Sequence, residues 1–120
     1  MKISIISASH RTKSQSKRIS HLLNNNLLNI HSGLEMFFLD LADASLPLWS
    51  PDKKNGKGVW GEIWSSISDK LLQSDGFIFV VPEYGGMATP AAKNFFLLCG
   101  NGELSHKPGL IVSVLSLIHI

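Results

Sequence analysis

The side chains of this sequence that could do chemistry lie in two polar segments, and the first of them suits an anion. It carries four serines, a threonine and two cations, in the order Ser7-Ala8-Ser9-His10-Arg11-Thr12-Lys13-Ser14-Gln15-Ser16. A helix is expected to begin here, and a helix N-terminus offers unpaired N–H groups and a partial positive charge. Hydroxyl groups donate to phosphate oxygens, and Arg11 can bind two oxygens at once. The composition of the segment favours a phosphate group. A solvated loop in which Ser14 only caps the helix explains the same composition equally well.

The kind of phosphate follows from the motifs that this first segment lacks. It has none of the spaced glycines of G-x-G-x-x-G, which serve a dinucleotide pyrophosphate, and no Gly-Lys-Ser/Thr ending of a nucleotide P-loop. A phosphate monoester is the ligand that remains.

The second segment suits a flat ligand and reads Pro82-Glu83-Tyr84-Gly85-Gly86-Met87-Ala88-Thr89-Pro90. Its paired glycines let backbone groups approach a ring closely. Tyr84 could pack against that ring, and Met87 is an adaptable apolar contact. The alternative is a turn whose glycines only satisfy the geometry of the backbone.

Strands and helices alternate along the chain that must position these segments. The run Phe77-Ile78-Phe79-Val80-Val81 is apolar on both faces, as a central parallel strand must be. Apolar residues at helical spacing, such as Leu23 and Leu27, indicate helices between the strands. We expect strands over 2–7, 34–39, 77–81 and 109–115, helices over 14–30, 59–73 and 90–98, and loops over 41–58 and 82–89. This order predicts an α/β fold with a parallel sheet covered on both faces, whose ligands bind beyond the carboxyl ends of the strands.

Both polar segments resemble loops of the NAD(P)H-dependent FMN reductases, a family that includes quinone, azo-dye and chromate reductases. The first loop of that family reads Gly-Ser-x-Arg-x-x-Ser-x-Asn, and residues 8–16 match it at the same spacing. The second reads Pro-Glu-Tyr-Asn-Gly-Ser, followed shortly by Leu-Lys-Asn; the corresponding residues here are Pro82-Glu83-Tyr84-Gly85-Gly86-Met87 and Ala92-Lys93-Asn94. The resemblance extends from Lys2 to about Val114.

This resemblance implies a flavodoxin-like doubly wound parallel sheet in three α/β/α layers. We expect a single FMN-binding domain over residues 1–120 that departs from the family after about residue 114. Family members continue past the fourth strand, so the chain is expected to lack the last strand and helices of the fold. The corresponding hypothesis is a truncated or frameshifted chain with an unpaired apolar edge at the strand over 109–115.

By the same resemblance, the first segment holds the phosphate of FMN through Ser9, Arg11, Ser14 and Ser16. The second lines the isoalloxazine ring, largely through backbone groups, with Pro82, Glu83, Tyr84, Gly85, Gly86 and Met87. Glu83 is expected to point away from the ring, toward Lys93 or solvent, because an anion there would disfavour reduction of the flavin. This chain departs from the family at Ala8, Ser16, Gly85 and Met87, and the last two changes remove polar side chains beside the flavin.

The implied activity is passage of hydride from NADPH or NADH through FMN to a small acceptor such as a flavin, quinone, azo compound or metal oxyanion. The flavin supplies this chemistry, so no catalytic side chain and no metal site is expected. Full-length relatives are expected to form homodimers or homotetramers. Two alternatives stay open, a flavodoxin-like electron carrier and an inactive truncated remnant.

Composition narrows the remaining classes of function. The net charge is only +2 and the cations form no stripe, so nucleic acid is not an expected partner. No stretch is long enough to cross a membrane and no signal peptide is visible, so we expect a cytoplasmic protein. The single cysteine, Cys99, lies in an apolar run, where a buried and inert thiol is expected. Trp60 and Trp64 share one face of the second helix, which predicts either core packing or a subunit interface.

Overall fold

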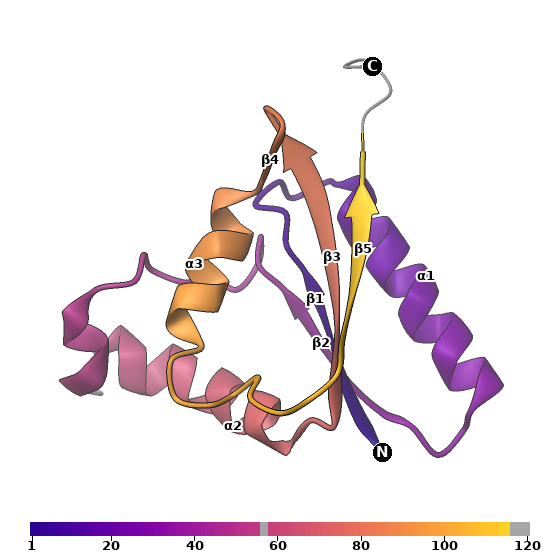
Figure 1. Ribbon diagram of the computed structural model, residues 1–120, viewed down its shortest axis with the longest axis horizontal. Coiled ribbons are helices and arrows are strands. Elements are labelled where there is room, and N and C mark those ends of the chain that lie inside the picture. The colour runs from indigo at the N-terminus through magenta and orange to yellow at the C-terminus, as the bar shows by residue number, and fades with distance from the viewer. Residues whose placement is uncertain (56–57, 116–120) are drawn as a thin grey trace.

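The computed structural model describes residues 1–55 and 58–115. Among them, four parallel strands form a sheet in the order β2-β1-β3-β5, and a short fifth strand, β4, pairs antiparallel with the end of β3 (Figure 1). The strands are β1 (Lys2–Ser7), β2 (Glu35–Asp40), β3 (Gly76–Tyr84), β4 (Met87–Ala88) and β5 (Gly109–Val114). The neighbours of β1 are β2 and β3, so the strand order reverses direction beside β1, as it does in flavodoxin-like sheets.

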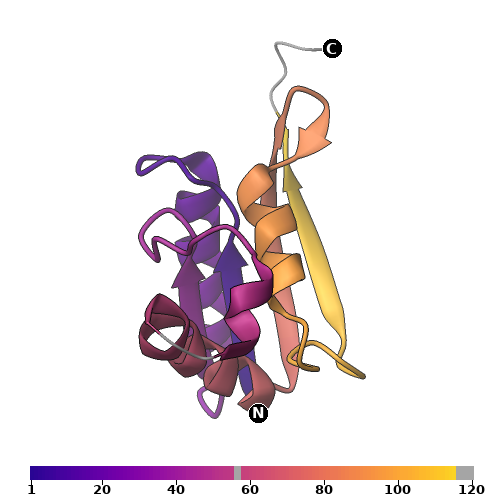
Figure 2. The same cartoon turned by 90° about the vertical axis from the view of Figure 1, so that its left-hand side faces the viewer.

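Helices cover both faces of this sheet, which confirms the predicted three-layer fold (Figures 1 and 2). One face carries α1 (Gln15–Ile30), and the opposite face carries α2 (Ser65–Gln73) and α3 (Pro90–Leu98). The strands alternate their side chains between these layers. On the α2/α3 side, Phe79 packs with Phe95 and other residues in a buried cluster, with ring centroids 6.3 Å apart.

Two helices, α1 and α3, begin at residues whose side chains satisfy free backbone N–H groups. Ser14 accepts a hydrogen bond from the Lys17 N–H at 3.0 Å, and Thr89 accepts one from the Ala92 N–H at 3.1 Å. Pro90 follows Thr89 at the first helical position, where its missing N–H has no partner to lose. These caps fix α1 and α3 directly after the two polar segments.

The helix predicted over 59–73 has two parts. It opens with a π-helical turn, Trp60–Trp64, and continues as α2 from Ser65. Both tryptophans are buried in the α2/α3-side cluster, so core packing is the correct interpretation of their spacing. The segment 41–58, expected to be a loop, contains a 3-10 helix over Pro51–Asn55.

The expected loop over 82–89 is wrong, because β3 continues to Tyr84 and turns directly into β4. Gly85 and Gly86 form the two-residue turn, with φ angles of +60° and +79°. Two consecutive positive φ angles give a type I′ turn, whose twist matches that of a β-hairpin. The pair of glycines therefore extends the central strand into a hairpin instead of ending it.

The outer edge of β5 has no strand partner among the described residues. Its apolar side chains are exposed on both faces, with Leu110 at 57% and Ile111 at 66%. Leu115 is the only described residue after β5 and belongs to no strand or helix. The last residues of the tail, on which the predicted departure from the family depends, lie outside the described ranges. No described helix has the length and apolar character to cross a membrane.

Candidate functional site

The two polar segments meet at the carboxyl ends of β1 and β3. The Ser9 hydroxyl lies 2.8 Å from the Tyr84 hydroxyl, and these residues are 75 positions apart in the chain. The Thr89 hydroxyl makes a second link by donating to the carbonyl oxygen of Ala8. The parallel pairing of β1 with β3 brings the segments together, because both strands end at the same edge of the sheet.

The first segment wraps around the N-terminus of α1 and brings its four predicted phosphate-binding residues onto one turn. Ser9 is fully buried and accepts a hydrogen bond from the Arg11 N–H at 3.1 Å. Ser14 caps the helix, and Ser16 is 1% exposed with a hydroxyl oxygen that has no partner. Arg11 is exposed and presents its guanidinium to solvent. The arrangement combines an accessible cation with a helix N-terminus, which is a donor set for phosphate.

Lys17, in the first turn of α1, is already committed to two carboxylates. Its Nζ lies 3.2 Å from Asp40 Oδ2, at the end of β2, and 3.2 Å from Asp43 Oδ2. The hydrogen bond to Asp40, followed by the one to Asp43, raises the pKa of Lys17 above its usual value of 10.5. These contacts hold α1 against the end of β2 and occupy Lys17, whereas Arg11 and Lys13 of the first segment are exposed.

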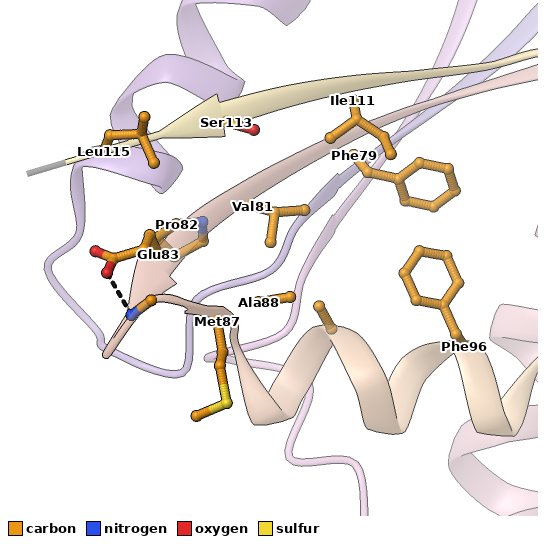
Figure 3. Close-up of a pocket in the computed structure, with 12 residues that line it drawn as sticks. Phe79, Val81, Pro82, Glu83, Met87, Ala88, Phe96, Ile111, Ser113 and Leu115 are labelled. Atoms are coloured by element: carbon orange, nitrogen blue, oxygen red, sulfur yellow. Dashed lines mark hydrogen bonds between the residues drawn. The ribbon is translucent and has the colours of Figure 1, made fainter.

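The hairpin of the second segment is closed by a carboxylate. Glu83 Oε1 accepts a hydrogen bond from the Gly86 N–H across the turn (Figure 3). The Glu83 side chain therefore contacts the turn itself, whereas the sequence analysis expects it to point toward Lys93 or solvent. Because a carboxylate is a strong acceptor for a backbone N–H, Glu83 stiffens the tip of the hairpin.

A cavity of about 320 Å³ lies between this hairpin, β5 and α3 (Figure 3). Four of the six residues predicted to line the flavin ring line this cavity: Pro82, Glu83, Gly86 and Met87. Phe79, Phe96, Ile111 and Leu115 contribute most of its apolar wall. Tyr84 and Gly85 do not line it, and Tyr84 points toward Ser9 because side chains alternate along the extended strand. The space around the turn is open, because a Cβ added at Gly85 or Gly86 would meet no atom within 4 Å.

Two residues with structural roles at the site were missed in the sequence. Thr89 is fully buried, caps α3 and ties it to the first segment. Asn94 donates to the Pro47 carbonyl oxygen at 3.0 Å and accepts from the Trp49 N–H at 2.7 Å, which clamps the loop after β2 onto α3. The Thr-Pro pair before an apolar helix is the signal that could have identified Thr89 as a cap. Nothing local to Asn94 predicts its contacts 45 and 47 residues away.

Other reactive groups of the described chain do not form a second centre. Burial, followed by the charge of Glu103, raises the pKa of Cys99 to about 12, so its thiol is protonated at neutral pH. No group of three His, Cys, Asp or Glu residues within residues 1–55 and 58–115 could hold a metal ion. The site offers binding groups for a phosphate and a ring, and a flavin mononucleotide carries both.

Comparisons with known proteins agree with this geometry. The family model described as NADPH-dependent FMN reductase matches residues 1–119. Among solved structures, the apo form of EMOB, an NADH:FMN oxidoreductase, aligns with a TM-score of 0.76 and 20% identity over 98% of this chain and 60% of its own. FerB, a flavoenzyme NAD(P)H:(acceptor) oxidoreductase from Paracoccus denitrificans, aligns with a TM-score of 0.67 and 22% identity over 93% of this chain and 59% of its own. The azoreductase AzrA aligns with a TM-score of 0.72 and 14% identity over 96% of this chain and 69% of its own.

At these identities the likeness to solved structures shows the fold. The chain spans about 60% of the length of the first two, EMOB and FerB. No curated protein matches the sequence.

Proposed function

Since this chain belongs to the NADPH-dependent FMN reductase family, we propose that it is an FMN-dependent oxidoreductase passing hydride from NADPH or NADH to a small acceptor. A flavin, a quinone, an azo compound or a metal oxyanion is the proposed class of acceptor. The observation that carries the proposal is the direct link between the two loops, Ser9 to Tyr84 at 2.8 Å, which makes a single site of a phosphate-binding and a ring-binding segment.

In this proposal the two segments divide the cofactor between them. The exposed Arg11 guanidinium and the free N–H groups at the start of α1 bind the phosphate, while Ser14 and Ser16 shape that turn. The ring packs against the hairpin Pro82–Met87 at the mouth of the cavity beside it. Bound flavin supplies the hydride chemistry, and the protein supplies orientation and electrostatics. A homodimer or homotetramer is proposed for longer relatives that include the rest of the fold.

A second candidate, an inactive remnant, is favoured by one observation. The outer edge of β5, next to the cavity, has no partner in the described part of the chain and exposes Ile111 and Leu115. Such a chain would fail to enclose the ring.

Titration of the purified chain with FMN tests the proposal, with flavin fluorescence as the readout and bleaching of flavin absorbance by NADPH under anaerobic conditions as the second step. We expect saturable binding followed by bleaching. Binding without bleaching supports a flavodoxin-like electron carrier, and absence of binding supports the remnant.

The Arg11→Gln variant tests the phosphate site separately. We expect its dissociation constant for FMN to rise about tenfold or more, because a hydrogen bond to a charged group contributes roughly 1.5–3 kcal/mol. Arg18→Gln is the matched control, since Arg18 is an exposed arginine on α1 outside the predicted phosphate-binding residues and bonds Gln15 Oε1 at 2.7 Å. Equal losses in both variants would remove Arg11 from the site.

A further inference from the structure

The outer edge of β5 presents backbone groups that no other strand uses within residues 1–55 and 58–115 (Figure 2). The Phe77 N–H of β3 donates to the Pro108 carbonyl oxygen at 3.0 Å, so the backbone carbonyl of residue 108 faces β3. Along an extended strand, the N–H and C=O groups of successive residues point to opposite sides. The even-numbered residues of β5 therefore face β3, and the residues whose N–H and C=O groups face outward are Gly109, Ile111 and Ser113.

This edge lacks the residues that protect edge strands from pairing with other chains. Residues 109–115 contain no charged residue and no proline. The opposite edge strand of the sheet, β2, begins at Glu35 and ends at Asp40. The edge at β2 thus carries a carboxylate at each end, whereas the edge at β5 is open to another strand.

Both faces of the open edge are apolar. On the α3 side, Ile111 lines the cavity of about 320 Å³ described above, and on the α1 side, Leu110 lines a second cavity of about 330 Å³. A strand that pairs with β5 must therefore be apolar on both faces, as β5 itself is. Large apolar side chains around the two cavities are 44–73% exposed and offer on the order of 700 Å² per copy, close to the roughly 800 Å² that each partner buries in a standard interface. They are Met1, Met87, Phe96, Leu110, Ile111 and Leu115.

We propose that two copies of this chain pair through their β5 strands, which run antiparallel across a two-fold axis at Ile111. A two-fold axis makes an interface self-complementary, so the same strand serves on both sides. In this register Ile111 lies opposite Ile111 of the second copy, and Gly109 lies opposite Ser113. Each of these pairs exchanges two N–H···O bonds, because all of its backbone groups face outward. The register keeps every outward-facing residue paired within Gly109–Val114.

Apolar side chains also meet on each face of the paired strands. The two Ile111 side chains are neighbours on the α3 side, and Leu110 lies opposite Val112 of the second copy on the α1 side. Because Ile111 and Leu115 line the cavity beside the hairpin, the pairing covers the side of that cavity that a single copy leaves exposed. The pairing requires no cofactor, so it stands or fails independently of the proposed function.

Cysteine cross-linking tests the register. In an antiparallel pair centred on Ile111, the Cα atoms of the two residues 111 are about 5.5 Å apart, whereas those of the two residues 113 are roughly 14 Å apart. A disulfide spans only the first of these distances. Under mild oxidation, Ile111→Cys should therefore form a covalent dimer on a non-reducing gel at least about tenfold faster than Ser113→Cys, the matched control on the same strand and face. The wild-type chain, whose single cysteine is Cys99, gives the background.

The Ile111→Pro variant tests the hydrogen bonds across the axis. The N–H of residue 111 faces outward, so proline removes a donor of the interface and keeps the ladder between β5 and β3. In sedimentation equilibrium we expect a dimer of the wild-type chain. In Ile111→Pro we expect the dissociation constant of that dimer to rise at least about tenfold, with an unchanged far-UV circular dichroism spectrum.

Several results overturn the proposal. A wild-type chain that stays monomeric, or that forms species larger than a dimer, excludes a closed pair. Equal cross-linking in the two cysteine variants, or none in Ile111→Cys, excludes the register. An equally tight dimer of Ile111→Pro places the interface elsewhere on the molecule. Should Ile111→Pro unfold, the comparison of the two cysteine variants decides alone.

Discussion

At the scale of single residues, Cys99 is only partly buried, whereas the sequence predicts a buried thiol, yet its surroundings still lower the reactivity of the thiol. The folded protein raises the pKa of its thiol from 9.0 to about 12, first through burial and then through the charge of Glu103. Between these values the unfolded chain releases the proton and the folded chain keeps it. The cysteine therefore contributes stability that is fully present below about pH 9 and is lost as the pH rises toward about 12.

Alkylation by iodoacetamide checks this protonation directly, because only the thiolate reacts. At pH 8 we expect the folded chain to react at least about a hundredfold more slowly than the chain unfolded in urea. Cys99 is the single cysteine, so the whole signal belongs to it. Equal rates in the two states would mean that the thiol is accessible and ionises normally.

At the scale of elements, the hairpin between β3 and β4 depends on two glycines with positive φ. Both have positive φ and open space around them, so strain in the backbone, not a clash, limits a substitution. Asparagine adopts this conformation readily at the first position of a type I′ turn, whereas alanine does not.

Urea unfolding of two variants measures this strain. Gly86→Ala should lower the free energy of unfolding by about 1 kcal/mol. Gly85→Asn, which restores the family residue, should change it by less than about 0.5 kcal/mol. Similar losses in both variants would contradict the assigned turn.

At the scale of the whole molecule, the outer edge of β5 has no strand partner among the described residues. An exposed apolar strand with unpaired N–H and C=O groups is a template for pairing with another chain. Leu110 and Ile111 are more than half exposed on opposite faces of this strand.

We therefore expect the 120-residue chain to associate as its concentration rises in sedimentation velocity. Ile111→Lys, which puts a charge on the edge, should shift it toward the monomer. Leu22→Lys is the matched control, since Leu22 is 51% exposed on α1, and should leave association unchanged. A chain that stays monomeric throughout would show that the edge is protected.

The elements that could be predicted from sequence are those with local signals. β1 over Lys2–Ser7 and α3 over Pro90–Leu98 have the predicted bounds, because a β-branched run and a proline after a cap mark them. The predicted strand over 77–81 ends before Pro82, since proline removes a ladder N–H. The strand nevertheless continues, because β1 has ended by that point and the hairpin supplies new pairs at Glu83 and Tyr84.

The candidate site was predictable in its segments and not in its internal contacts. The loop motifs identify Arg11 and the hairpin residues as neighbours of one ligand. The Ser9–Tyr84 bond, the Glu83 contact across the turn and the Asn94 clamp depend on register and strand length, which the sequence pattern does not specify. Tertiary structure therefore decides which residues of the predicted set contact one another.

The links from Ser9 to Tyr84 and from Ala8 to Thr89 also set when the site can form during synthesis and folding. They join residues 75 and 81 positions apart, so the first loop leaves the ribosome long before its partners are synthesised. Contacts at such separation form only after the chain between them has closed. The site therefore does not exist during early folding. In the proposed function, FMN binds only a domain that has already assembled through α3, and then stabilises that domain by mass action.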